Sequence, residues 1–157
     1  MPSYKGHLVG GVVTYILMIK LLTWMGIVHS VSIMHHCILL TATLLGSLFP
    51  DIDIQSKGQR LLYMAMAFMV PLSFFYHKSI FLGLSLLCLI LVVIPHRTLT
   101  HSLWFIVLTP TVITLAYMHT HPHLIRTIPV SICILFISGA LNHRLLDVGF
   151  KRFFSKR

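Results

Sequence analysis

The apolar residues of this chain gather in long runs that are separated by short polar segments. A transmembrane helix needs about 20 mainly apolar residues, and several of these runs are shorter. The pattern therefore predicts an all-α protein, a polytopic membrane helical bundle of four to six transmembrane or interfacial helices. The candidate spans are residues 8–26, 33–49, 61–76, 80–95, 103–118 and 127–146.

The composition is typical of an integral membrane protein. Hydrophobic residues make up 57% of the chain and charged residues only 10%, whereas about 25% of the residues of an average soluble domain are charged. No polar stretch is long enough for a second domain, so residues 1–157 are expected to form one domain. The three cysteines lie inside separate apolar runs and have no zinc-finger or disulfide spacing.

Only three residues are acidic, namely Asp51, Asp53 and Asp147, and each follows an apolar run. A carboxylate at membrane depth is costly unless it is paired or binds a cation, so these acids indicate a site. If six spans cross the membrane alternately, four histidines lie on the same face as the acids. These are His7, His96, His101 and His143.

The spacing of several of these residues suits metal binding. His143 and Asp147 are four positions apart, so a helix brings both side chains to one face, where they can hold one ion. Asp51 and Asp53 cannot share a helix face, but an irregular turn after Pro50 can aim both inward, and one of them can bridge two ions.

The remaining histidines need particular helix ends to reach the site. The five-residue spacing of His96 and His101 fits if one helix ends at His96 and the next starts at His101, with Thr98 or Thr100 as its cap. His7 precedes two glycines by one turn, and these allow another helix to approach closely. For His7 alone, a histidine that simply faces lipid headgroups is an equally good explanation.

Four imidazoles and three carboxylates are too many ligands for one tetrahedral zinc ion. They suit two or three divalent transition-metal ions, with Zn expected first and Mn or Fe as alternatives. Such ions activate water and neutralise charge on a phosphoryl oxygen. Arg97 and Arg144 each adjoin a proposed ligand and can clamp a phosphate. The candidate catalytic residues are Asp53, Arg97 and Arg144.

A simpler interpretation is that these residues form ion pairs at helix ends, such as Asp147 with Arg144 or Lys151. Each pair taken alone favours that interpretation, but seven candidate ligands on one face favour a site. The other seven histidines map to the opposite face, and the tract from His119 to His123 has no acidic partner. We interpret that tract as a solvated loop and exclude it from the site.

Basic residues indicate the orientation of the chain. Nine of the twelve lysines and arginines fall on the face that carries the proposed ligands, which by the positive-inside rule is cytoplasmic. Basic loops beside anionic lipid headgroups account for the net charge of +9, so membrane lipids are expected partners and a nucleic acid is not.

Three motifs carry a resemblance to a known family. The segments Pro50-Asp51-Ile-Asp53, His96-Arg97-Thr-Leu-Thr-His101 and Asn142-His143-Arg-Leu-Leu-Asp147 resemble the YdjM-like family of bacterial inner-membrane proteins, which are regarded as metal-dependent hydrolases. That family is distantly similar to zinc-dependent phospholipase C, a helical enzyme with a trinuclear site. The resemblance implies metal roles for His7, Asp51, His96, His101, His143 and Asp147, with Asp53 as a ligand or its partner.

Two positions depart from the family pattern. Asn142 stands where serine is frequent and Thr98 where glycine is frequent, which leaves the ligands intact but alters the expected shape of the pocket.

The sequence thus predicts a membrane-embedded, metal-dependent hydrolase that uses metal-activated water on a phosphoester of a lipid or lipid-linked substrate. A site at headgroup depth meets lipids before soluble metabolites. One alternative is a divalent-metal transporter, which would need polar residues through the depth of the helices. Another is a non-enzymatic membrane protein with a structural metal site, which would have a closed coordination shell.

Overall fold

The computed structural model describes residues 4–28, 32–53, 102–122 and 127–149, together with positions 60, 63–64, 66–68 and 71. These residues form helices, and no strand occurs among them. The elements are α1 (Tyr4–Trp24), α2 (Ile33–Leu48), the 3-10 helix η1 (Phe49–Asp53), α5 (Leu103–Thr120) and α6 (Thr127–Val148). The predicted all-α class is therefore confirmed.

Four helices are long and apolar enough to cross a membrane, the second being α2 with the start of η1. They coincide with the predicted spans 8–26, 33–49, 103–118 and 127–146. Within predicted span 61–76 the described positions are helical, whereas span 80–95 lies outside the described residues. The observed α1 starts four residues before the apolar run, because a helix can continue through polar residues beyond the hydrocarbon.

Two details of the predicted helix ends were wrong. The helix after His101 begins at Leu103, and the residue at its N-cap position is Ser102 rather than Thr98 or Thr100. The acidic segment after α2 is a regular 3-10 helix, not an irregular turn.

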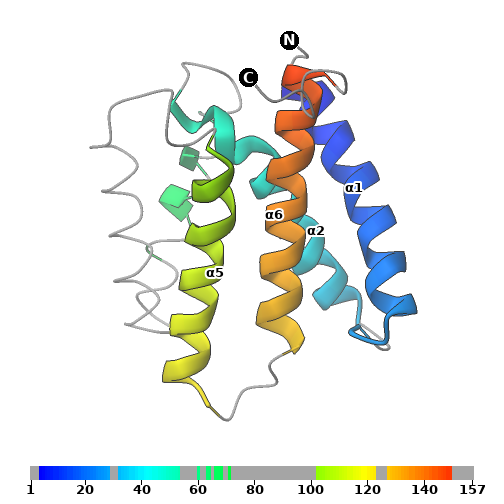
Figure 1. The fold of residues 1–157 in the computed structure, drawn as a ribbon, viewed down its shortest axis with the longest axis vertical. Coiled ribbons are helices and arrows are strands. Elements are labelled where there is room, and N and C mark those ends of the chain that lie inside the picture. Colours follow the sequence, from blue (N-terminus) through cyan, green and yellow to red (C-terminus); the bar gives the residue numbers. More distant parts are fainter. Residues whose placement is uncertain are drawn as a thin grey trace.

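The helices run alternately up and down (Figure 1). α6 lies at the centre and contacts α1, α2 and α5. The start of α1, the end of α2, the start of α5 and the end of α6 all lie at the end of the bundle where both termini are drawn. For the described helices, this arrangement agrees with the alternate crossing that was predicted from the positions of the polar residues.

α2 and α6 approach each other closely at two glycines. A Cβ atom on Gly46 would collide with the backbone of Phe136, and one on Gly139 would collide with the backbone of Thr43 and Ser47. Helices in lipid have no hydrophobic drive to associate, so close packing of small residues is what holds such a pair together. The two helix backbones are therefore in direct contact one turn from the end of α2.

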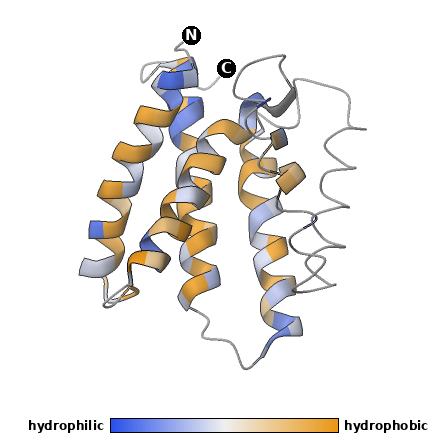
Figure 2. Ribbon diagram, turned by 180° about the vertical axis from the view of Figure 1, so that it is seen from behind, coloured by the Kyte–Doolittle hydropathy of each residue, from blue (hydrophilic) through white to orange (hydrophobic). Residues whose placement is uncertain are grey.

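Most of the residues along the described helices are hydrophobic (Figure 2), and many of the large ones are exposed. Val9, Val13 and Leu17 of α1 and Val112 of α5 are among the exposed apolar side chains. Such a surface suits contact with lipid chains. In the half of the bundle away from the termini, buried leucines and a valine form a core cluster of Leu22, Val28, Leu39 and Leu135.

Candidate metal centre

Three segments bring four polar side chains together at the end of the bundle that carries the termini. His7 comes from the first turns of α1, Asp51 from η1, and His143 and Asp147 from the end of α6. The two histidines are almost fully enclosed, at 2% and 0% exposed, whereas the Asp147 and Asp51 side chains are 9% and 16% exposed. The cluster is thus accessible mainly from its carboxylate side.

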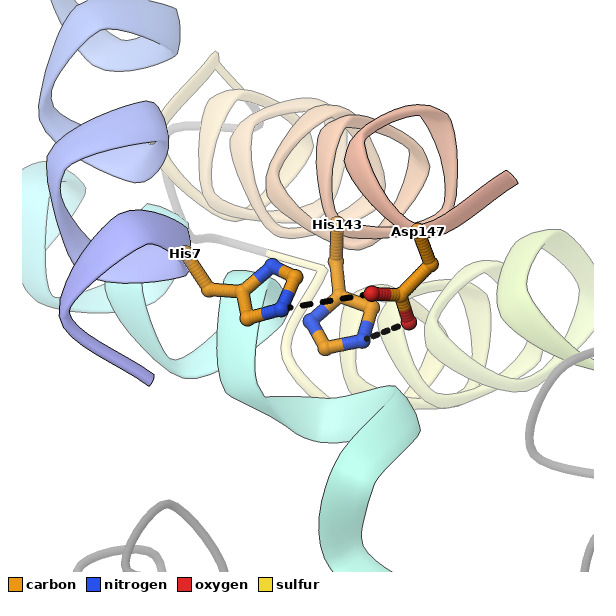
Figure 3. Close-up of side chains that lie close together, drawn as sticks. All are labelled: His7, His143 and Asp147. Carbon is orange, nitrogen blue, oxygen red and sulfur yellow. Dashed lines mark ion pairs between the residues drawn. The ribbon is translucent and has the colours of Figure 1, made fainter. Parts of the chain in front are cut away.

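Asp147 contacts both histidines, one with each carboxylate oxygen (Figure 3). Its Oδ2 lies 3.0 Å from His143 Nε2, as expected for a pair four positions apart on one helix. Its Oδ1 lies 3.4 Å from His7 Nε2. Asp51 Oδ1 lies 3.3 Å from His143 Nε2, which joins the segment after α2 to the same cluster.

The two imidazole rings are stacked. Their centroids are 3.8 Å apart and their planes differ by 17°. Two protonated imidazoles held this way would repel each other strongly because little water separates them. The stack therefore requires that at least one of the two rings be neutral.

The other ring nitrogen of His143 is fixed by the backbone of α2. His143 Nδ1 lies 2.6 Å from the carbonyl oxygen of Ser47, in a buried contact. A carbonyl oxygen only accepts hydrogen bonds, so Nδ1 must carry the proton and donate it. In the neutral ring, Nε2 then presents a lone pair to the carboxylates of Asp51 and Asp147. That arrangement needs a cation between them, either a second proton on the ring or a metal ion.

The donor set fits a transition-metal ion. Imidazole nitrogen and carboxylate oxygen are ligands for Zn, Mn and Fe, and two such ligands on a tetrahedral zinc ion lie about 3.3 Å apart. The nitrogen-to-oxygen separations in the cluster, 3.0–3.4 Å, are of this size. Ligand atoms of His7, His143 and Asp147 all lie within 4.8 Å of one another.

Two buried nitrogen atoms at the cluster lack a hydrogen-bond partner within the described part of the chain, namely His7 Nδ1 and Asn142 Nδ2. Buried polar atoms are rarely left in this way. The amide nitrogen of Asn142 is a donor, so its expected partner is an acceptor such as a water molecule or a ligand oxygen rather than a metal ion.

The structure brings together four of the seven predicted ligands: His7, Asp51, His143 and Asp147. Asp53 ends η1, but its side chain is outside the described part. His96, Arg97 and His101 also lie outside the described residues. Arg144 follows His143 on α6 and is half-buried. The metal and catalytic roles of all these residues stay predictions.

Sequence reasoning missed two groups beside the cluster. The first is the carbonyl of Ser47, for which the signal was Pro50, a residue without an N–H three positions later in the chain. The second is the amide of Asn142, whose nitrogen is packed against Gly10 of α1. The glycines after His7 predicted a close approach of another helix, but a single sequence does not say which residue makes it, so only the structure could identify Asn142.

Comparison with known proteins gave one result. The chain matches the family described as YdjM inner membrane protein over residues 1–152. Neither the curated proteins nor the solved structures gave a match.

Proposed function

Since the chain belongs to the YdjM family of inner membrane proteins, we propose that it is a metal-dependent hydrolase that cleaves a phosphoester of a lipid or lipid-linked substrate. As a member of that family with several apolar helices, it is a multi-pass inner membrane protein. The observation that carries the proposal is the buried cluster of two histidines and two carboxylates at one end of the bundle.

His7, His143, Asp51 and Asp147 would hold the metal. Each oxygen of Asp147 faces a different histidine, as in a carboxylate that bridges two ions. We therefore propose that Asp147 would be the carboxylate shared by two ions, a role that the sequence had suggested for Asp51 or Asp53.

The ions would supply Lewis-acid stabilisation of a phosphoryl oxygen and activation of a water molecule. The residues of the chain would exclude water and bind the substrate. The buried imidazoles exclude bulk water from one side, and the carboxylates of Asp51 and Asp147 are the more exposed groups of the cluster. Arg144, beside His143, and Arg97 are proposed to bind the substrate phosphate, and Asp53 to complete the ligand set or its hydrogen bonds.

The position of the cluster favours a lipid substrate. His7 lies in the first turns of α1 and Asp147 in the last turn of α6, so both lie near the level where a membrane-spanning helix meets the headgroups. A phosphodiester or phosphomonoester in a lipid headgroup reaches this depth without leaving the bilayer. The excess of basic residues that the sequence predicts for this face favours a cytoplasmic orientation, and the described Lys5 is exposed there.

A divalent-metal transporter fits the described helices less well. A transport path needs polar groups that are available to an ion through the depth of the bundle. The buried or half-buried hydroxyls of Thr43, Ser131 and Ser138 instead donate to carbonyls of their own helices. Among the described residues, the buried imidazoles and their carboxylate partners lie together at one end of the bundle.

Elemental analysis of the protein, purified in mild detergent without a metal-affinity tag, tests the proposal. We expect about two transition-metal ions per wild-type chain, loss of both in His143→Ala and retention in the control His36→Ala. Metal-loaded protein should then hydrolyse phospholipid or polyprenyl-phosphate substrates in vesicles. Metal binding without hydrolysis of any of them would favour a structural metal site. A wild-type chain that binds no Zn or Mn after repletion would show that the cluster is an ion-pair network.

A further inference from the structure

We propose that the backbone carbonyl of Ser47 is a positioning group for His143, and that the glycine contact between α2 and α6 places it there. It holds the ring with Nδ1 protonated and Nε2 turned toward Asp51 and Asp147. The inference rests on the proposed function only in naming a metal ion as the group that Nε2 meets. The positioning itself can be measured without metal.

Pro50 limits the backbone donors that the carbonyl of Ser47 can meet. At a helix end this carbonyl can accept from the N–H of residue i+3 in 3-10 geometry or of residue i+4 in α geometry, and the residue at i+3 is Pro50, which has no N–H. At the same helix end, the carbonyl of Gly46 is bonded by the N–H of Phe49. Pro50 therefore removes one backbone donor for the Ser47 carbonyl, where His143 Nδ1 approaches to 2.6 Å.

The glycines bring that carbonyl within reach of α6. Gly46 directly precedes Ser47, and Gly139 lies one helical turn before His143. Each glycine faces the backbone of the other helix, with no room for a Cβ atom. The glycine contact therefore adjoins Ser47 on α2 and lies one turn from His143 on α6. If the two helices moved apart, the hydrogen bond from His143 Nδ1 to the Ser47 carbonyl would lengthen.

The side chain of Ser47 leaves this arrangement undisturbed. Its hydroxyl donates to the carbonyl of Leu44 in its own helix, at 2.8 Å. The buried ring of His143 therefore meets an acceptor whose position is set by the backbone rather than by a rotatable side chain. Groups that fix the orientation of a histidine ligand typically change metal affinity by about 10–100-fold.

Nitrogen NMR of the metal-free protein, labelled with ¹⁵N in its histidine rings, tests the proposal directly. The His143 signals are assigned as those lost in His143→Asn. We expect Nδ1 to carry a proton that it donates to the Ser47 carbonyl, whether or not Nε2 is also protonated. A ring whose single proton lies on Nε2 would overturn the proposal. If His143 Nδ1 is protonated as expected but the chain binds no metal, only the proposed function is contradicted.

Gly139→Ala tests the role of the helix contact. We expect about 10–100-fold weaker metal binding and a mixture of tautomers at His143. Ser138→Ala is the neighbouring control, since its hydroxyl bonds to its own helix. Leu135→Ala is the control for general destabilisation, because Leu135 is buried in the core away from the site. Equal losses of affinity in Gly139→Ala and Leu135→Ala would contradict the role of the glycine contact. If Gly139→Ala does not fold, the wild-type tautomer still decides the role of Ser47.

Discussion

The two ends of the bundle both carry histidines, but they use them differently. At the end with the termini, histidines from α1 and α6 are buried, stacked and in contact with carboxylates. At the other end, three of the described histidines make exposed or local hydrogen bonds. His36 Nδ1 shares one of 2.6 Å with Tyr15 Oη, His35 one of 2.8 Å with Ser32, and His121 one of 2.8 Å with Thr120.

The difference lies in the acids rather than in the number of histidines. All three acidic residues of the chain belong to the first end. A buried imidazole beside a carboxylate forms a site for a cation, whereas an exposed imidazole beside a hydroxyl has water as an equal partner. The candidate site therefore differs from a histidine-rich surface because histidines from separate helices contact the same carboxylate.

The largest effect is expected for Asp147→Asn. The amide keeps the shape of the side chain but removes the charge that both histidines face. We expect loss of both ions, a decrease in affinity of more than about 100-fold, and loss of hydrolysis. Metal content after dialysis against a weak chelator measures this. Retention of two ions would show that Asp147 is not the shared ligand.

Asp51→Asn is expected to have a smaller effect at the same end. Asp51 contacts His143 at 3.3 Å, whereas Asp147 contacts both histidines. We expect one ion to be lost or weakened by about 10-fold, with the other retained. Metal titration followed by calorimetry resolves the two events. A loss identical to that in Asp147→Asn would favour a single ion held by both carboxylates.

Leu135→Ala separates packing from binding. Leu135 is fully buried beside Leu22 and Leu39, away from the histidine stack. The cavity should lower the free energy of unfolding by about 2 kcal/mol or more, while the folded protein keeps its metal content. Unfolding in mixed micelles, monitored by circular dichroism, measures the first quantity, and elemental analysis measures the second. Metal loss in the folded variant would mean that the two ends of the bundle are coupled.

The smallest effect is expected for His36→Ala, the counterpart of His143→Ala at the other end. Its hydrogen bond to Tyr15 is exposed, so its removal should cost less than about 1 kcal/mol and leave metal content and hydrolysis unchanged. The same unfolding and metal assays check this. A measurable loss of metal would show that the end of the bundle with His36 also binds metal.

Much of the helical framework was predictable because a helix that crosses a lipid bilayer must be largely apolar. Apolar runs located α1, α2, α5 and α6 to within a few residues, since each span must be apolar for about the thickness of a bilayer. Alternation of the spans then placed the start of α1 and the end of α6 at the same end. The four-residue spacing of His143 and Asp147 gave their contact, because helix geometry is local.

The stacking of His7 on His143 and the contact of Asp51 with His143 were not predictable in detail. Both depend on how far each helix is rotated about its axis and how closely α2 approaches α6. The apolar surfaces of these helices have almost no preferred side, so hydrophobic pattern does not fix the rotation. Contacts of individual small residues, such as Gly46 and Gly139, do so instead.

The cluster also sets an order of events during synthesis. Its histidine on α1 leaves the ribosome first, the acid after α2 follows, and the ligands on α6 come last. Until α6 is inserted, His7 has neither its carboxylate partner nor its stacking partner. A chain that stops before residue 143 therefore lacks two of the four residues of the cluster, which is completed only when α1, the segment after α2 and α6 have all been inserted.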